Sequence, residues 1–111
     1  MMQHAHPLSF NARMQLLEAW CDANPYLLGV IEMSVVQQAM SGKRRILTAQ
    51  LIDQVNAEFK NQNAPVFYLD QNDVEHTYRP SAVDAVVLGK FVHDRRPTLG
   101  VEYYAQPQGR R

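Results

Sequence analysis

Cysteine, histidine and clustered carboxylates are the residues of this chain that are most able to do chemistry. Cys21 is the only cysteine, and it lies on the apolar stripe of a predicted helix, where cysteine is usually a small core residue. His4 and His6 are two positions apart near the amino terminus, while His76 and His93 are each alone on their elements. None of these spacings is typical of a zinc site or of a paired nucleophile and base. We therefore predict no metal, no cofactor and no catalytic residue.

The segment 70–75 has the carboxylate density of a calcium loop. Such a loop needs glycine at its sixth position and glutamate at its twelfth, whereas this chain has Glu75 and Ser81 there. The five glycines stand apart at positions 29, 42, 89, 100 and 109, which excludes the glycine-rich loops that bind phosphates or dinucleotides. The sequence thus favours a non-enzymatic protein, and an enzyme without a recognisable motif is the least favoured option.

Composition indicates one globular domain. The chain has 111 residues, of which 46% are hydrophobic and 20% charged, as is usual for a folded domain. Eleven basic and eleven acidic residues balance, which argues against nucleic-acid binding by bulk charge but allows a local basic patch. A protein without net charge also lacks the repulsion that keeps copies apart, so we expect self-association, most simply a homodimer.

Cysteine usage and hydropathy indicate where the protein works. A single thiol cannot form an internal disulfide, which points to a reducing compartment. The amino terminus shows no basic region followed by an apolar run, so we predict no signal peptide. The longest apolar stretch, 26–36, contains Glu32 and is too short to span a bilayer. We predict a cytoplasmic protein without a membrane segment.

The elements that position these residues begin with two helices. The first is expected over 10–22, with Ser9 or Asn11 as its cap. Asn24 and Pro25 then suit the cap and first position of a second helix, which runs to about Ser41 and ends at Gly42. This second helix is apolar almost all round, which is typical of a helix buried in the domain or in a subunit interface.

The rest of the chain predicts a third helix, a hairpin and a fourth helix. A helix is expected over 48–62, capped by Thr48, and a β-hairpin of 66–69 and 74–78 follows around a turn at 70–73. The fourth helix is expected over 82–95, with Ser81 as cap and Asp84 completing a partial capping box. A short strand is expected within 99–104. The fold class is therefore α+β, with a single domain at 9–104 between flexible tails at 1–8 and 105–111.

The predicted core follows from the apolar stripes of these elements. It comprises Met14, Leu17, Trp20, Leu28, Ile31, Val35, Leu51, Val55, Phe59, Phe67, Val87 and Phe91, and we expect Val83 and Val86 on the apolar face of the fourth helix.

Three helices followed by a β-hairpin resemble a winged helix-turn-helix in the order of their elements. In that family the third helix enters the DNA major groove and the hairpin reaches the backbone or minor groove. The resemblance implies that four basic residues would contact the DNA phosphates and that three amide side chains of the third helix would face the bases. The residues in question are Lys43, Arg44, Arg45 and Arg79 for phosphate, and Gln50, Gln54 and Asn61 for bases.

An adaptor or inhibitor that binds a protein partner is the alternative hypothesis. Its contact would be the acidic hairpin tip or the segment Tyr103-Tyr104. The two hypotheses predict different surfaces. DNA binding needs the basic residues on one face beside an exposed third helix, whereas an adaptor needs an exposed apolar patch away from them.

Overall fold

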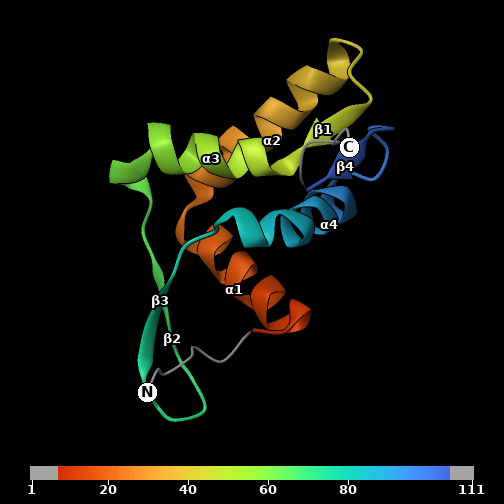
Figure 1. The fold of residues 1–111 in the computed structure, drawn as a ribbon. Coiled ribbons are helices and arrows are strands. Elements are labelled where there is room, and N and C mark those ends of the chain that lie inside the picture. Colours follow the sequence, from red (N-terminus) through yellow and green to blue (C-terminus); the bar gives the residue numbers. More distant parts are fainter. Residues whose placement is uncertain (1–7, 106–111) are drawn as a thin grey trace, which may run out of the picture.

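The structure is a computed structural model that describes residues 8–105. The predicted flexible tails, 1–8 and 105–111, lie outside the described residues except for Leu8 and Ala105. The elements in chain order are α1 (Phe10–Ala23), α2 (Pro25–Met40), β1 (Arg45–Leu47), α3 (Thr48–Glu58), the 3-10 turn η1 (Lys60–Gln62), β2 (Val66–Leu69), β3 (Glu75–Tyr78), the 3-10 turn η2 (Ala82–Asp84), α4 (Ala85–Arg95) and β4 (Glu102–Tyr104) (Figure 1). The predicted α+β class, with four helices and a hairpin after the third, is confirmed.

Local signals mark the ends of the first two helices, and the cap at Ser9, the start at Pro25 and the end at Gly42 agree with the prediction. The Ser9 side chain caps α1 by accepting a hydrogen bond from the Ala12 amide at 3.1 Å. Pro25 is the first residue of α2, where its missing N–H costs nothing. At the other end of α2, Gly42 has a φ of 98°, which glycine adopts without strain. The amide of the next residue, Lys43, donates to the Gln38 carbonyl at 3.0 Å, which closes a Schellman motif.

The start of the third helix differs from the prediction. Thr48 does not cap α3 but is its first residue, and its side chain is fully buried. Its hydroxyl donates to the Ala85 carbonyl at 2.8 Å, so it joins α3 to the start of α4. The expected helix over 48–62 also stops at Glu58, and η1 follows it.

Two small sheets complete the fold. Strands β2 and β3 form the predicted antiparallel hairpin, with Val66 opposite Tyr78. Strand β4 confirms the expected strand within 99–104, but it pairs in parallel with β1, a strand that the sequence did not indicate. Gly89 allows β4 to lie against α4, because a Cβ there would be 3.1 Å from the Tyr103 Cβ.

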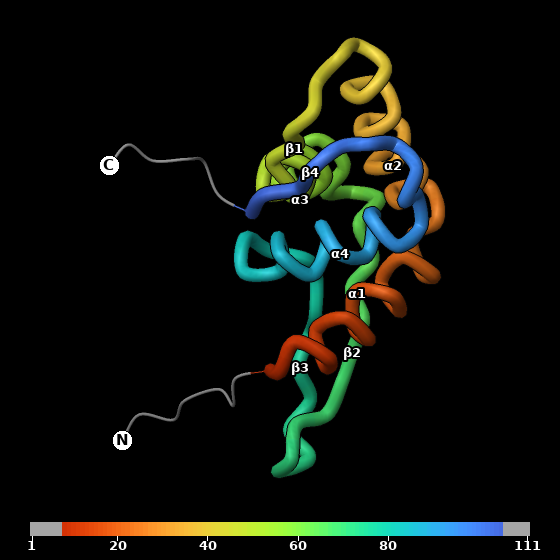
Figure 2. Tube along the Cα trace, turned by 90° about the vertical axis from the view of Figure 1, so that its right-hand side faces the viewer, coloured from red at the N-terminus to blue at the C-terminus, as the bar shows by residue number. Residues whose placement is uncertain are grey.

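The core lies where α1, α3 and α4 meet, with α2 packed behind α3 (Figures 1 and 2). Its fully buried members include Leu17, Trp20, Leu27, Ile46, Ile52, Leu88, Val35 and Val92, with Cys21 also buried as predicted. Asp84, which is buried, forms the expected capping box with Ser81 and accepts a hydrogen bond from Arg13 at 3.0 Å. That ion pair fastens α1 to the beginning of α4.

Three residues that the sequence placed on buried faces are exposed instead. Phe67 alternates onto the outer face of the hairpin, because only the opposite face packs on the helices. Val83 lies in the 3-10 turn η2, which has three residues per turn, so its side chain does not continue the apolar face of α4. Val86 points away from the face of α4 that carries Leu88 and Val92. Met14, Leu28, Phe59 and Phe91 are partly buried against the core.

Candidate functional site

The hairpin β2–β3 extends from the helical body past α1 as an arm (Figures 1 and 2). Its two faces differ because strand residues alternate. The inner face carries Val66, Tyr68, His76 and Tyr78, which are buried or half-buried. The outer face carries two large apolar side chains, Phe67 and Leu69, opposite Thr77 and Glu75.

The turn of the hairpin is held by Asp70. One carboxylate oxygen of Asp70 accepts hydrogen bonds from the amides of Asn72 at 2.7 Å and Val74 at 3.0 Å. The other lies 2.7 Å from Nε2 of His76, whose ring stacks on Tyr68. The hydrogen bond with His76, followed by that from the Val74 amide, lowers the pKa of Asp70 below its ordinary value. The turn residues 71–74 are exposed, as expected of a hairpin turn, and the hydrogen bonds to Asp70 hold the backbone of the turn.

The base of the hairpin is joined to the helices by a network of buried and half-buried asparagines. Asn63, which is 5% exposed, accepts a hydrogen bond from the Trp20 indole N–H at 2.7 Å. Its amide nitrogen donates to Asn56 at 2.9 Å, and Asn56 in turn donates to the Pro80 carbonyl at 2.9 Å. The network therefore links α1, α3 and the chain that leaves β3.

Asn24 extends this connection from the junction of α1 and α2. Its side chain forms no helix cap, contrary to the sequence prediction. Instead its amide group donates to the carbonyls of Trp20 and Ala64, each at 2.9 Å, and accepts from the Ala64 amide at 2.8 Å. These bonds fasten the segment that enters β2, so the arm leaves the body in a set direction. A single sequence does not reveal such a network, since its members are far apart along the chain.

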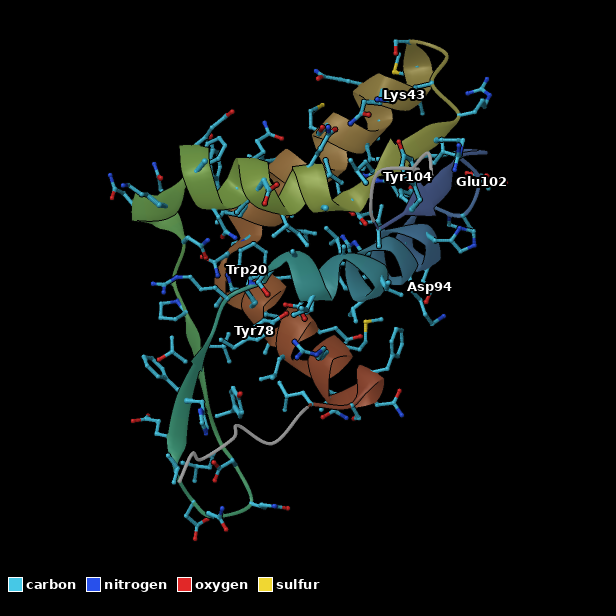
Figure 3. The ribbon with its side chains drawn as sticks, viewed as in Figure 1. Trp20, Lys43, Tyr78, Asp94, Glu102 and Tyr104 are labelled. Atoms are coloured by element: carbon cyan, nitrogen blue, oxygen red, sulfur yellow. The ribbon has the colours of Figure 1, made fainter. Side chains whose placement is uncertain are left out.

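The predicted phosphate contacts lie in two places. Lys43, Arg44 and Arg45 are exposed before the amino end of α3. Lys43 lies at the end of the molecule away from the hairpin (Figure 3). Arg45 places its guanidinium 4.7 Å from the centre of the Tyr104 ring. Arg79 instead lies beyond the carboxyl end of α3, where its Nε donates to the Asn63 carbonyl at 2.9 Å. The basic residues therefore flank α3 instead of forming one cluster.

The predicted base-facing amides are also divided. Gln50 is exposed on α3, and Gln54 is half-buried beside α2. Asn61 is exposed but lies on η1, after α3 has ended. Asp53 and Glu58 share the exposed side of this helix. The DNA-binding role of these residues stays a prediction.

A shallow groove of about 400 Å³ lies between α4 and β4. Lys90, His93, Glu102 and Tyr104 line it, but Lys90 is already paired with Asp94 at 3.1 Å. Within residues 8–105, no group of three or more histidine, cysteine or acidic side chains is arranged to hold a metal ion. No helix of this part of the chain is long and apolar enough to cross a membrane.

Comparison with known proteins adds no assignment to this geometry. No protein-family model, curated protein or solved structure matches the chain.

Proposed function

We propose that the protein is a non-enzymatic adaptor or inhibitor that binds a protein partner through the outer face of the hairpin β2–β3. The observation that supports this is the exposure of three large apolar side chains on one arm. Phe67, Leu69 and Val74 are 61%, 62% and 52% exposed. Apolar side chains gathered on one protruding element are typical of protein–protein contacts.

The order of the arm supports binding with little entropic cost. The Asp70 hydrogen bonds hold the turn, and the asparagine network holds the base. A surface that is already in its bound shape loses less freedom when a partner docks. The hairpin therefore presents Phe67 and Leu69 as anchors that need no rearrangement.

The charge beside the anchors defines the chemistry of the partner. Asp73 and Glu75 are exposed next to the apolar side chains, and no lysine or arginine occurs between 66 and 78. Complementary surfaces match opposite potentials. The partner is therefore expected to offer an apolar cleft for Phe67 and Leu69 with lysine or arginine at its rim.

The test immobilises the wild-type protein and outer-face variants and compares which proteins each one captures from an extract of the source cells. The double variant Phe67→Ser, Leu69→Ser should lose a partner that wild type retains. The control variant Val83→Ser, which changes an exposed apolar residue outside the hairpin, should retain that partner. The retained protein is then purified and titrated with both variants. A partner that binds the double variant and wild type equally well would contradict the proposal.

DNA binding is a second candidate function, favoured by the exposure of Lys43 and Arg44. Neither forms an ion pair with another residue of the described range. The test is fluorescence anisotropy of labelled mixed-sequence duplex DNA at low and moderate salt. Binding that weakens steeply with salt and is lost when Lys43, Arg44 and Arg45 are changed to Glu would support it. Absence of binding at low salt would exclude this function.

A further inference from the structure

A second exposed apolar surface runs along α2. Successive residues of an α-helix are rotated by about 100°, so residues seven apart return to nearly the same side. Tyr26, Met33 and Met40 are spaced in this way and are 64%, 58% and 81% exposed. Gly29, Val30 and Gln37 fall between them on the same side, and we call these six residues the α2 stripe. The core residues of α2, Leu27, Ile31 and Val35, lie on the opposite side.

The α2 stripe contains no charged residue. The only charged residue of α2 is Glu32, which lies off the stripe and is held by Arg95 at 2.6 Å and by Arg96 at 3.7 Å. The outward side of a surface helix is normally polar. An uncharged apolar stripe on that side is therefore a surface that another protein would cover.

The two ends of the stripe have complementary shapes. A groove of about 610 Å³ follows the stripe from Pro25 to Gln37, with Gln54 of α3 also in its lining, and it is open over Gly29, where a Cβ would meet nothing within 4 Å. Tyr26 forms one wall of this groove and is braced edge-to-face by Phe59, with 5.9 Å between the ring centres. At the other end, the Met40 side chain projects into solvent. Met40 is eleven positions after Gly29, which corresponds to about 16 Å along the helix.

We infer that a second copy of this chain covers the α2 stripe, with the two α2 helices antiparallel across a two-fold axis. In this arrangement the projecting Met40 of each copy enters the groove over Gly29 of the other, as a knob enters a hole. The axis then crosses each helix near Met33 to Val36. The Met40 sulfur of one copy then lies against the Tyr26 ring of the other copy, and contacts between sulfur and an aromatic ring are favourable.

Charge and shape favour a second copy over an unrelated protein. A two-fold axis places like residues near one another, which is unfavourable for charged surfaces, but the α2 stripe carries no charge to repel. The chain as a whole also has no net charge. The stripe extends about 21 Å along one helix, so the interface is smaller than those of obligate dimers. The dimer should therefore be reversible, with a dissociation constant in the micromolar range.

The first experiment is sedimentation velocity of the full chain over a range of concentrations. Wild type should change from monomer to dimer, whereas Gly29→Leu fills the hole and should weaken association by about ten-fold or more. Gln15→Leu, which introduces the same side chain at an exposed position of α1, should associate as wild type does. Circular dichroism verifies that each variant is folded. A monomer at every concentration, or equal association of both variants, would overturn the inference.

A cross-linking experiment tests the antiparallel direction. Gly29→Cys and Met40→Cys are prepared separately and then mixed under mild oxidation, while the native thiol Cys21 stays buried. The antiparallel dimer predicts a disulfide between the two different variants, formed about ten-fold faster than within either variant alone, because like positions lie about 16 Å apart. Cross-linking that is equally fast or faster within a single variant would indicate a different arrangement and refute the antiparallel pairing.

Discussion

Replacing Asn63 by alanine tests whether the buried asparagine network holds the hairpin to the body. The substitution removes the acceptor of the Trp20 indole N–H, and the Trp20 side chain is fully buried. It also removes the donor to Asn56. The neighbour Gln62 is exposed and serves as the matched control, since Gln62→Ala removes a side chain of similar chemistry without touching the network.

The magnitude follows from the two lost bonds. A buried donor left without a partner costs about 1–3 kcal/mol, and the second hydrogen bond contributes about 1 kcal/mol. We therefore expect Asn63→Ala to lower the free energy of unfolding by about 2–4 kcal/mol, and Gln62→Ala to change it by less than about 0.5 kcal/mol. A loss of this size is a large part of the total stability of a small domain.

The assay is urea unfolding followed by the fluorescence of Trp20, which is the only tryptophan. Because the substitution changes the environment of the probe itself, circular dichroism should give the same transition midpoint. A loss below about 0.5 kcal/mol would show that water replaces the amide at no cost, and the proposed role of the network in fixing the arm would be wrong.

Three further predictions concern the thiol, the turn and the core. Burial raises the pKa of Cys21 to about 12, so Ellman's reagent should label this thiol at pH 8 only when urea unfolds the protein. The stability that the neutral thiol contributes is complete below its unfolded pKa of 9.0 and is lost as pH rises towards 12. Because the pKa of Asp70 is lowered in the folded protein, its contribution to the stability of the turn is present above the ordinary carboxyl pKa of 3.8 and is lost as pH falls through the folded pKa. The amide NMR signal of Val74 should report this loss in wild type but not in Asp70→Asn. Leu51→Ala, at a buried position, should cost about 2–4 kcal/mol in urea unfolding, whereas Leu69→Ala, at an exposed one, should cost less than about 0.5 kcal/mol; equal losses would contradict the placement of these two faces.

Much of the secondary structure could be predicted because its signals are local. Pro25 starts α2, Gly42 ends it, and Ser81 with Asp84 starts the turn into α4, each through contacts within a few residues. The hairpin was equally evident, since two alternating runs flank a turn of Asp and Asn residues. Apolar periodicity also identified central core residues such as Leu17 and Val87.

Other features depend on which elements pack together, and only the tertiary structure decides them. Strand β1 has three residues and pairs with β4 near the other end of the chain, so no local pattern marks it. The apolar side chains of α2 occur all round the helix, and packing against α1 and α3 determines that Ile31 is buried while Met33 is exposed.

The candidate sites follow the same division. By itself the sequence determined that the chain folds as an α+β domain, that α2 carries more apolar surface than one face needs, and that an acidic turn joins two strands. The tertiary structure decided that Phe67 belongs to an outer face, that Asn63 bonds both Trp20 and Asn56, and that Asn24 bonds the segment that enters β2. The physical reason is that helix caps and turns depend on neighbours within a few residues, whereas burial depends on partners that only the folded chain brings together.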